Sequence, residues 1–310
     1  MKLAAVDIGS NAIRFQITNA LKYNGVVNFK KVEYVRFPLR LGQDVFKNNK
    51  ISPEKEAKFI KLMHTFKMLL DLYEVQDYMF CATSAMRESE NGREIADRVK
   101  KEIGVEIDII DGDKEAELIN SVLFTELDDR SYVHIDVGGG STELNIFVNK
   151  EKIAARSFKI GSVRRLGQMD SPEEWKEMKS WIKKNVKDKY GTIRAIGTGG
   201  NIGKIYELAN LSRGKSLKPT ISLDKIEKVH DTVSKMTYDE RIHVLMLNPD
   251  RADVIIPASE IYTSVMKWAE AKEMVVPELG LKDGLIQLLY KRNSHNVENI
   301  VINYTNKFPK

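Results

Sequence analysis

The sequence has little of several features that mark particular classes of protein. It contains one cysteine in 310 residues, Cys81, which excludes an intramolecular disulfide and fits a reducing compartment, so we expect a cytoplasmic protein. Cys81 stands in the apolar stretch 78–82, which favours a buried structural thiol over a nucleophile. No apolar run reaches about eighteen residues, and the N-terminal apolar stretch is too short for a signal peptide. We therefore expect no contact with a membrane.

Metal-ligand spacing, strong net charge and flexible linkers are also absent. The five histidines are scattered, so none is assigned to a site. The net charge of +5 permits a basic ligand channel but does not by itself indicate nucleic acid, and we expect no nucleic-acid partner. The length suits two domains, and no low-complexity linker separates them. We place the boundary near 125–130, which predicts domains of residues 1–125 and 126–310.

The stretch 132–146 organises the rest of the chain. Val133, Ile135 and Val137 alternate with polar residues, which is the period of a strand, and a second alternating segment begins at Leu144. Between them lie Gly138, Gly139 and Gly140. Three glycines remove every Cβ from the bend, so converging backbone N–H groups can form a concavity that attracts an anion.

Two acids flank this glycine turn. Asp136 enters it and Glu143 leaves it. A carboxylate beside a phosphate repels it unless a divalent cation lies between them, so the pattern indicates phosphate together with a hard metal such as Mg²⁺. The alternative is an ordinary hairpin with a glycine-rich turn.

The same device occurs twice, which favours the phosphate interpretation. The segment that begins Val6-Asp7-Ile8-Gly9-Ser10-Asn11 aligns without a gap with Ile135–Gly140, and the two aspartates lie 129 positions apart (136 minus 7). Strand–turn–strand therefore appears near the start of each half. We expect two similar domains, each offering a phosphate-binding turn to a shared cleft.

Strands alternate with helices along the rest of the chain, which predicts an α/β fold. Ser52, with proline behind it, should cap a helix that runs to about residue 73, and Asp113 should cap another that runs to about 127. Residues 36–43 read as an irregular basic segment. Helices are expected at 172–187, 222–235, 238–245 and 251–271, the last kinked by Pro257, and at 280–292. The tail at about 297–310 could pack back on the first domain.

Two common nucleotide-binding motifs are absent. Gly197 and Gly203 are separated by five residues rather than four, and Ile205 stands where a Walker A loop requires serine or threonine. No G-x-G-x-x-G sequence opens a helix after the first strand, so a dinucleotide-binding Rossmann site is also disfavoured.

At the level of motifs the chain resembles the exopolyphosphatase / guanosine pentaphosphate phosphohydrolase (Ppx/GppA) family of the actin-like superfamily. The resemblance spans nearly the whole chain and rests on these segments in order: 7–11 with Arg14, 83–87, 112–116, 136–143, 161–163, 197–200, 251–253 and 280–284. It implies two actin-like (ribonuclease H-like) domains with a cleft between them. Because the sequence ends at residue 310, the resemblance is to a short form without a C-terminal helical extension.

The resemblance also implies an activity. Members cleave the terminal phosphate from inorganic polyphosphate with Mg²⁺ (or Mn²⁺), and a homodimer is expected. The alternatives are hydrolysis of pppGpp at its 5′ end to ppGpp, and a non-catalytic sensor that binds polyphosphate or (p)ppGpp. A kinase of the same superfamily, which transfers phosphate from ATP to a small acceptor, is a further alternative.

The matching motifs imply catalytic roles for four residues. Glu115 corresponds to the catalytic glutamate that deprotonates the attacking water, although an acid at a helix start is also favoured by the helix dipole, as Asp113 would be. Asp136 and Glu143 correspond to the acids that hold the metal or help to activate water. Arg87 corresponds to a phosphate-binding arginine that offsets developing charge.

A larger set is implied to bind phosphate through backbone or side-chain donors: Ser10, Asn11, Gly138, Gly139, Gly140, Ser141, Gly197, Thr198 and Gly199. For Arg14, a surface or sheet-edge charge is an equal alternative. For Arg251–Asp253 and Lys282-Asp283, structural ion pairing and helix capping are at least as strong an alternative as ligand contact.

The chain departs from the family pattern at three positions. Ala12 stands where serine commonly follows the first turn, Lys282 where arginine often precedes Asp-Gly, and Asn201 where threonine or serine is usual. These changes bear on the choice between polyphosphate and nucleotide.

Overall fold

The chain forms two six-stranded sheets, one in each of two compact units. The computed structural model describes residues 1–186, 189–210, 219–294 and 301–303, and the chain divides into two compact units. Unit 1 comprises Met1–Val122 and Leu281–Lys310, and unit 2 comprises Leu123–Gly280. The predicted boundary after residue 125 lies three residues from the first division, but the chain returns to unit 1 at Leu281 instead of completing a domain of residues 126–310.

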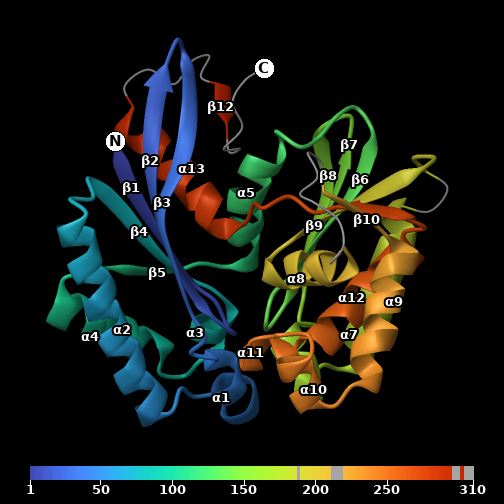
Figure 1. Cartoon of the computed structure of the whole chain (residues 1–310), viewed down its shortest axis with the longest axis horizontal. Helices are drawn as coiled ribbons and strands as arrows, with labels where there is room; N and C mark the ends of the chain where they lie inside the picture. The colour runs from blue at the N-terminus through green and yellow to red at the C-terminus, as the bar shows by residue number, and fades with distance from the viewer. Residues whose placement is uncertain (187–188, 211–218, 295–300, 304–310) are drawn as a thin grey trace. The chain divides into compact units, whose positions relative to one another are not determined.

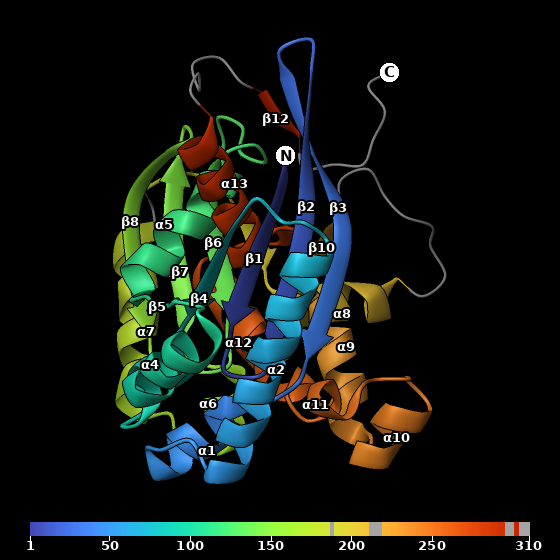
Figure 2. The same cartoon turned by 90° about the vertical axis from the view of Figure 1, so that its left-hand side faces the viewer.

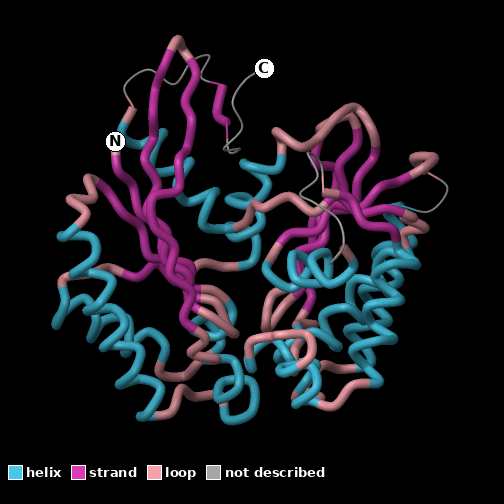
Figure 3. Tube along the Cα trace, in the orientation of Figure 1, coloured by secondary structure: helices cyan, strands magenta, loops and turns pink. Residues whose placement is uncertain are grey.

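The sheet of unit 1 has the strand order β12-β3-β2-β1-β4-β5 (Figures 1 and 3). β1 pairs antiparallel with β2 and parallel with β4, and β2 pairs antiparallel with β3. The strands are β1 (Lys2–Ile8), β2 (Ile13–Tyr23), β3 (Val26–Phe37), β4 (Asp77–Ala82), β5 (Ile107–Ile109) and β12 (Val301–Asn303). The helices are α1 (Leu41–Asn48), α2 (Pro53–Leu72), α3 (Ser84–Glu88), α4 (Gly92–Ile103), α5 (Gly112–Leu123) and α13 (Leu281–Asn293).

The sheet of unit 2 has the order β10-β11-β9-β6-β7-β8. β6 pairs antiparallel with β7 and parallel with β9, and β7 pairs antiparallel with β8. The strands are β6 (Ser131–Val137), β7 (Thr142–Val148), β8 (Glu151–Phe158), β9 (Ile193–Thr198), β10 (Thr220–Ser222) and β11 (Glu273–Val275). The helices are α6 (Ser162–Leu166), α7 (Pro172–Val186), α8 (Gly200–Ala209), α9 (Leu223–Lys235), α10 (Tyr238–His243), α11 (Pro249–Ala252) and α12 (Ile255–Trp268).

The two sheets repeat one topology. A meander of three antiparallel strands is followed by two parallel strands, so that β3-β2-β1-β4-β5 corresponds to β8-β7-β6-β9-β11. Each first strand ends in a turn that carries one of the two predicted phosphate motifs. The duplication predicted from the two aspartate motifs is therefore present in the fold.

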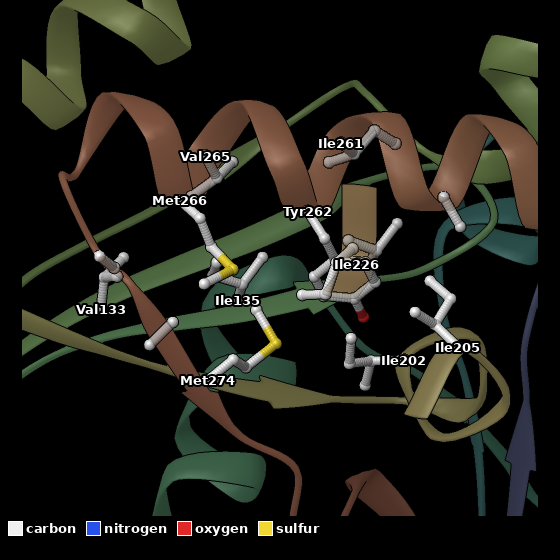
Figure 4. Close-up of a cluster of buried hydrophobic side chains, with 14 of the residues drawn as sticks. Val133, Ile135, Ile202, Ile205, Ile226, Ile261, Tyr262, Val265, Met266 and Met274 are labelled. Atoms are coloured by element: carbon white, nitrogen blue, oxygen red, sulfur yellow. The ribbon is translucent and has the colours of Figure 1, made fainter. Parts of the chain in front are cut away.

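Helices cover the sheets through apolar faces. In unit 1, α2 runs along the strands (Figure 2), and Phe66 of α2 stacks on Phe15 of β2 with ring centroids 4.8 Å apart. In unit 2, Val133, Ile135 and other inward residues of the sheet pack against α12 (Figure 4). Because side chains alternate along a strand, burying this apolar set on one face places Asp136 and its alternating neighbours on the other.

Helix α13 is held in unit 1 by specific contacts. Its Asp283 accepts a hydrogen bond from Gln16 of β2 (3.3 Å), and its Arg292 donates to Asp77 of β4 (3.0 Å). A Cβ atom built on Gly284 would lie 2.2 Å from the carbonyl oxygen of Leu118 in α5. At this point α13 packs against α5 so closely that no side chain fits at position 284. Of the predicted tail, residues 301–303 form β12, which pairs with β3, and the rest lies outside the described residues.

Several local predictions can be compared with the structure. Ser52 caps α2 and accepts from the amide of Lys55, with Pro53 in the first turn, as predicted. The predicted cap at Asp113 is wrong, because Asp111 accepts from the amide of Lys114 (2.7 Å) and α5 begins at Gly112.

Two longer segments also differ from prediction. The segment 36–43 was predicted to be irregular, but helix α1 begins within it, at Leu41. The residue before the helix, Arg40, has a left-handed φ of 56°. The predicted kink at Pro257 is wrong as well: 251–271 divides into α11 and α12, and Pro257 lies in the first turn of α12, where its missing N–H has no intrahelical partner to lose.

We predict that Gly284→Ala destabilises unit 1. The added methyl would meet backbone atoms of Leu118, which cannot move aside as a flexible side chain can, so we expect a loss of about 1–3 kcal/mol in the free energy of unfolding. Urea unfolding followed by circular dichroism measures the change. Gly203→Ala is the control, since a Cβ there meets nothing within 4 Å, and it should leave stability unchanged or raised. Equal midpoints for Gly284→Ala and the wild type would contradict this packing.

Candidate active site

The β6–β7 turn of unit 2 is fixed through its carbonyl groups. The amides of Ser162 and Val163, at the start of α6, donate to the carbonyls of Gly138 and Gly139 (both 2.9 Å), and the Arg164 side chain donates to the carbonyl of Gly140 (2.8 Å). This approach requires glycine at position 161 as well, because a Cβ there would lie 2.4 Å from the Gly139 oxygen.

Because the carbonyls of the turn are hydrogen-bonded on one side, amides of the turn can donate to a ligand on the other. The amide of Gly138 donates to the carbonyl of Ser141 (2.9 Å), so this predicted phosphate donor is already engaged within the hairpin. The amides of Gly139, Gly140 and Ser141 donate to no acceptor within the described residues. Consecutive unengaged amides in a bend form an anion-binding concavity.

Two carboxylates stand beside this turn. Asp136 and Glu143 are partners in register on adjacent antiparallel strands, so their side chains lie on the same face of the sheet. Glu143 is 2% exposed and accepts hydrogen bonds from the hydroxyls of Ser141 (2.6 Å) and Ser157 (2.9 Å). Like charges placed directly opposite one another destabilise a sheet unless a cation compensates them, which makes this pair a fitting place for one.

The turn that follows β9 lies against Asp136. Gly199 has a φ of 90°, and a Cβ there would lie 2.8 Å from Oδ1 of Asp136, so the turn into α8 passes directly over that carboxylate. The preceding Thr198 is buried, and its carbonyl accepts from the hydroxyl of Tyr262 (2.8 Å). Burial, and then the charge of Asp136, hold the pKa of Tyr262 well above its ordinary value. The phenol therefore stays protonated and donates the hydrogen bond to Thr198.

Gly197 has a different environment from the other predicted phosphate contacts. It lies inside β9, opposite Ile135 in register, and a Cβ there would lie 2.4 Å from the sulfur of Met274 in the core. Packing against Met274 accounts for this glycine.

The corresponding turn of unit 1 is built in the same way. The amides of Gly42 and Arg40 donate to the carbonyls of Ser10 (2.8 Å) and Asn11 (3.0 Å), as the first residues of α6 do in unit 2. The hydroxyl of Ser10 shares a hydrogen bond with that of Ser84 (2.8 Å) at the start of α3. Asp7, the counterpart of Asp136, has Arg14 as its partner in register and pairs with it at 2.7 Å. Unit 1 therefore neutralises its motif aspartate internally.

Glu115 lies at the same end of the unit 1 sheet as Asp7. It is half-buried on the first turn of α5, whereas Asp113 in the same turn is exposed. Burial, and then the charges of Asp108, Asp7 and Glu115, raise the pKa of Cys81 to about 12. Cys81 is the partner of Asp7 in register, and the amide of Ile110, just ahead of α5, donates to the carbonyl of the next residue, Ala82 (3.0 Å), so α5 begins at the end of the sheet that carries the Asp7 turn.

Arg87 is also part of unit 1. It occupies the last turn of α3, is half-buried, and donates through Nη1 to the carbonyl of Ile110 (2.6 Å), just ahead of α5. This contact fixes the base of the guanidinium near the start of the helix that carries Glu115.

A family model described as the Ppx/GppA phosphatase family matches residues 22–293. The chain belongs to the Ppx/GppA phosphatase family. This confirms the resemblance inferred from the motifs.

Curated and solved relatives agree with this assignment. Exopolyphosphatase 1 of Mycobacterium tuberculosis is 23% identical over 309 residues, covering 92% of this chain and 87% of that protein. A bifunctional 3-dehydroquinate synthase/phosphatase of Fusobacterium nucleatum is 29% identical over 89% of this chain, which spans only 44% of that longer protein.

Structural comparison establishes the fold. The crystal structure of an exopolyphosphatase from Cytophaga hutchinsonii matches with a TM-score of 0.83 at 22% identity, covering 95% of this chain and 99% of that one. The predicted fold class, α/β with two actin-like domains, is confirmed.

Within this Ppx/GppA phosphatase, contacts support the structural alternative for two predicted segments. Arg251 donates to the side-chain oxygen of Asn201 (2.6 Å), whose amide in turn donates to the hydroxyl of Ser162 (3.3 Å). Asn201, one of the three departures, therefore links α8 to the helix that holds the glycine turn. Lys282 and Asp283 form an ion pair at 2.6 Å.

The acids do not form a preassembled metal cage. Within residues 1–186, 189–210, 219–294 and 301–303, no three His, Cys, Asp or Glu side chains group as metal ligands. Two adjacent carboxylates nevertheless fit Mg²⁺, which commonly takes one or two from the protein and the rest of its oxygens from phosphate and water. In the same described part of the chain, no helix is both long enough and apolar enough to cross a membrane.

A pocket of about 480 Å³ in unit 2 contains none of the residues assigned to catalysis, phosphate or metal, although Asp253 of the segment 251–253 lines it. It is lined in part by Arg165, which is paired with Glu260 (2.8 Å) and Asp170 (3.3 Å). These charges are compensated among themselves, so the pocket does not displace the glycine turns as the candidate site.

No histidine stands in a recognisable site motif, yet His134 lies fully buried on the face that carries the acids. Its Nδ1 faces the side-chain amide of Asn145 (3.0 Å), and its Nε2 faces the hydroxyl of Thr198 (2.8 Å). Burial lowers the pKa of His134 to about 3, so the imidazole is neutral. The signal in the sequence was the strand period, which puts residues 134 and 136 on one face.

We predict that Cys81 resists thiol reagents in the folded protein. With a pKa of about 12, only about one thiol in ten thousand is ionised at pH 8, and only the thiolate reacts. Ellman's reagent should therefore detect no thiol in the native phosphatase at pH 8, and one per chain after unfolding in guanidinium. Rapid reaction of the native protein would show that Cys81 is not buried as described.

Proposed function

We propose that this chain is an exopolyphosphatase, which hydrolyses the terminal phosphate of inorganic polyphosphate. The observation that carries the proposal is the arrangement in unit 2 of three unengaged amides, those of Gly139, Gly140 and Ser141, beside the carboxylates of Asp136 and Glu143. Such a surface suits a phosphate and a divalent cation together. Relatives named as exopolyphosphatases, matched over most of their length, favour polyphosphate as the substrate.

The reaction adds water across one phosphoanhydride bond. The water oxygen attacks the terminal phosphorus, the bond to the bridging oxygen breaks, and the products are orthophosphate and a chain shorter by one phosphate. The chemistry needs the water to lose a proton and the developing charge on the phosphoryl oxygens to be stabilised.

The side chains can be given roles in that reaction. Glu115 accepts the proton of the attacking water, and its half-buried position on α5 suits a general base better than that of the exposed Asp113. The turn amides donate to phosphate oxygens, and Ser10, Asn11, Thr198 and Gly199 contribute in the same way. Arg87 offsets negative charge through the part of its guanidinium that does not contact Ile110.

Asp136 and Glu143 would hold the cation, Mg²⁺ or Mn²⁺. Bound there, it would offset the charge of neighbouring phosphate groups. Glu143 is kept in place by the hydroxyls of Ser141 and Ser157, which prevents its carboxylate from turning away.

Nothing in the fold or the relatives favours pppGpp over polyphosphate, and an ATP-dependent kinase or a non-catalytic sensor has no observation in its support. Homodimer formation and a cytoplasmic location remain predictions from the resemblance and the single cysteine.

We predict that Glu115→Gln lowers the rate of phosphate release from polyphosphate by about 10²–10⁴-fold, as expected for loss of a general base, and keeps polyphosphate binding. Colorimetric phosphate release and a filter-binding assay measure the two properties. Asp113→Asn in the same helical turn is the matched control and should keep near wild-type turnover. Full activity of Glu115→Gln would exclude Glu115 as the base.

Removal of divalent metal should stop the reaction. We predict that EDTA abolishes phosphate release and that added Mg²⁺ or Mn²⁺ restores it, whereas Asp136→Asn should remain inactive at metal concentrations that saturate the wild type. Turnover that continues in EDTA would show that the acid pair does not serve a cation. Release of phosphate from pppGpp but not from polyphosphate would overturn the choice of substrate.

A further inference from the structure

A second row of polar side chains lies directly behind the acids on the unit 2 sheet. The front row runs in register across the strands, from Ser157 through Glu143 and Asp136 to Thr198. Two residues further back on the same face, Asn145 and His134 are also partners in register, and both are 0% exposed. The proposed reaction uses the front row and gives no role to the one behind it.

The hydrogen bonds of His134 have a defined direction. The amide nitrogen of Asn145 can only donate, so Nδ1 of His134, 3.0 Å away, accepts and carries no proton. The imidazole then carries its proton on Nε2 and donates it to the hydroxyl oxygen of Thr198 at 2.8 Å. One tautomer satisfies both contacts, and the Thr198 side chain is held by a donor from the sheet.

Thr198 is fixed from the opposite side as well. Its carbonyl accepts from Tyr262, which points from α12 toward the strands (Figure 4). Gly199 follows at once, and its α-carbon lies so close to Asp136 that a Cβ there would be 2.8 Å from the carboxylate. A shift of Thr198 would therefore move the backbone that bounds Asp136.

We propose that His134, held as the Nε2-protonated tautomer by Asn145, is a positioning residue that acts through the Thr198 hydroxyl to keep the β9–α8 turn against Asp136. In this role it sets the place of a carboxylate that, under the proposed function on which this inference rests, holds the divalent cation. Groups behind a metal-holding acid commonly determine metal affinity in this way.

A simpler alternative is that His134 only fills the interior. A filler would need no hydrogen bond to a residue of the site, and apolar residues would fill the same space without the cost of burying polar atoms. The two interpretations differ in what happens when Thr198 cannot accept the hydrogen bond.

A double-mutant cycle tests the proposal. His134→Phe should weaken Mn²⁺ binding, measured by electron paramagnetic resonance on the full chain, by about 10- to 100-fold, and Thr198→Val should do the same. The double variant should be no weaker than either single variant, because both remove one interaction. His134→Gln, whose amide can accept from Asn145 and donate to Thr198, should bind Mn²⁺ nearly as well as the wild type. Losses that multiply in the double variant, or wild-type binding by His134→Phe, would overturn the proposal.

A matched control separates this role from general stability. His230 on α9 makes a similar histidine–hydroxyl contact, to Ser259 of α12 at 2.8 Å, and neither residue belongs to the proposed site. His230→Phe should lower the melting temperature and leave Mn²⁺ affinity unchanged. If it weakens Mn²⁺ binding as much as His134→Phe does, destabilisation explains both effects and the proposal fails.

The tautomer has its own test, independent of activity. ¹⁵N NMR of histidine-labelled protein at pH 7 should show His134 as neutral imidazole protonated on Nε2, and protonation on Nδ1 would overturn the proposal. The outcomes also separate this inference from the proposed function. If the wild type binds Mn²⁺ through this network but releases no phosphate, the exopolyphosphatase proposal fails and the role of His134 stands.

Discussion

Both halves of the molecule depend on one constraint: the carbonyl groups of each motif turn are bonded to amides at the start of a short helix. In unit 2 the donors are the first residues of α6, and in unit 1 they are Arg40 and Gly42 at the start of α1. A peptide group whose oxygen is held on one side presents its N–H on the other. The turn amides can therefore face a ligand only because these helices occupy the opposite side, and glycine at positions 42 and 161 permits the approach.

The duplicated units share this backbone device but not its charge. In register with Asp7 stand Arg14 and Cys81, whereas in register with Asp136 stand Glu143 and Thr198. The first aspartate is neutralised by its neighbour, and the second is placed beside another acid. A cation offsets the repulsion between an anion and two carboxylates, so under the proposed function the metal would be held by unit 2.

The features that depend on local sequence patterns could be predicted from the sequence. The two aspartate–glycine motifs, the strands that carry them and the duplication were recovered, because alternation and glycine runs are local signals. Helix α1 was missed because its start is defined by hydrogen bonds to Ser10 and by the left-handed Arg40, neither of which leaves a periodic pattern. The place of α13 in unit 1 depends on Gly284 meeting Leu118 and on Asp283 meeting Gln16, contacts across more than 160 residues. His134 was passed over because a lone histidine has no motif, although the strand period already placed it behind Asp136.

The buried row of His134 and Asn145 makes sense only in relation to the acids in front of it. Desolvating an imidazole and an amide costs free energy that an apolar pair would avoid, and each group must be fully hydrogen-bonded to limit that cost. An apolar pair, however, has no directional contact with Thr198 and would leave its hydroxyl free to rotate. Under the proposed function, Asp136 would hold a cation, and a ligand of defined geometry requires neighbours whose positions are equally defined. On this account the polar row lowers the stability available from the interior and, in return, removes alternative positions of the turn that borders Asp136.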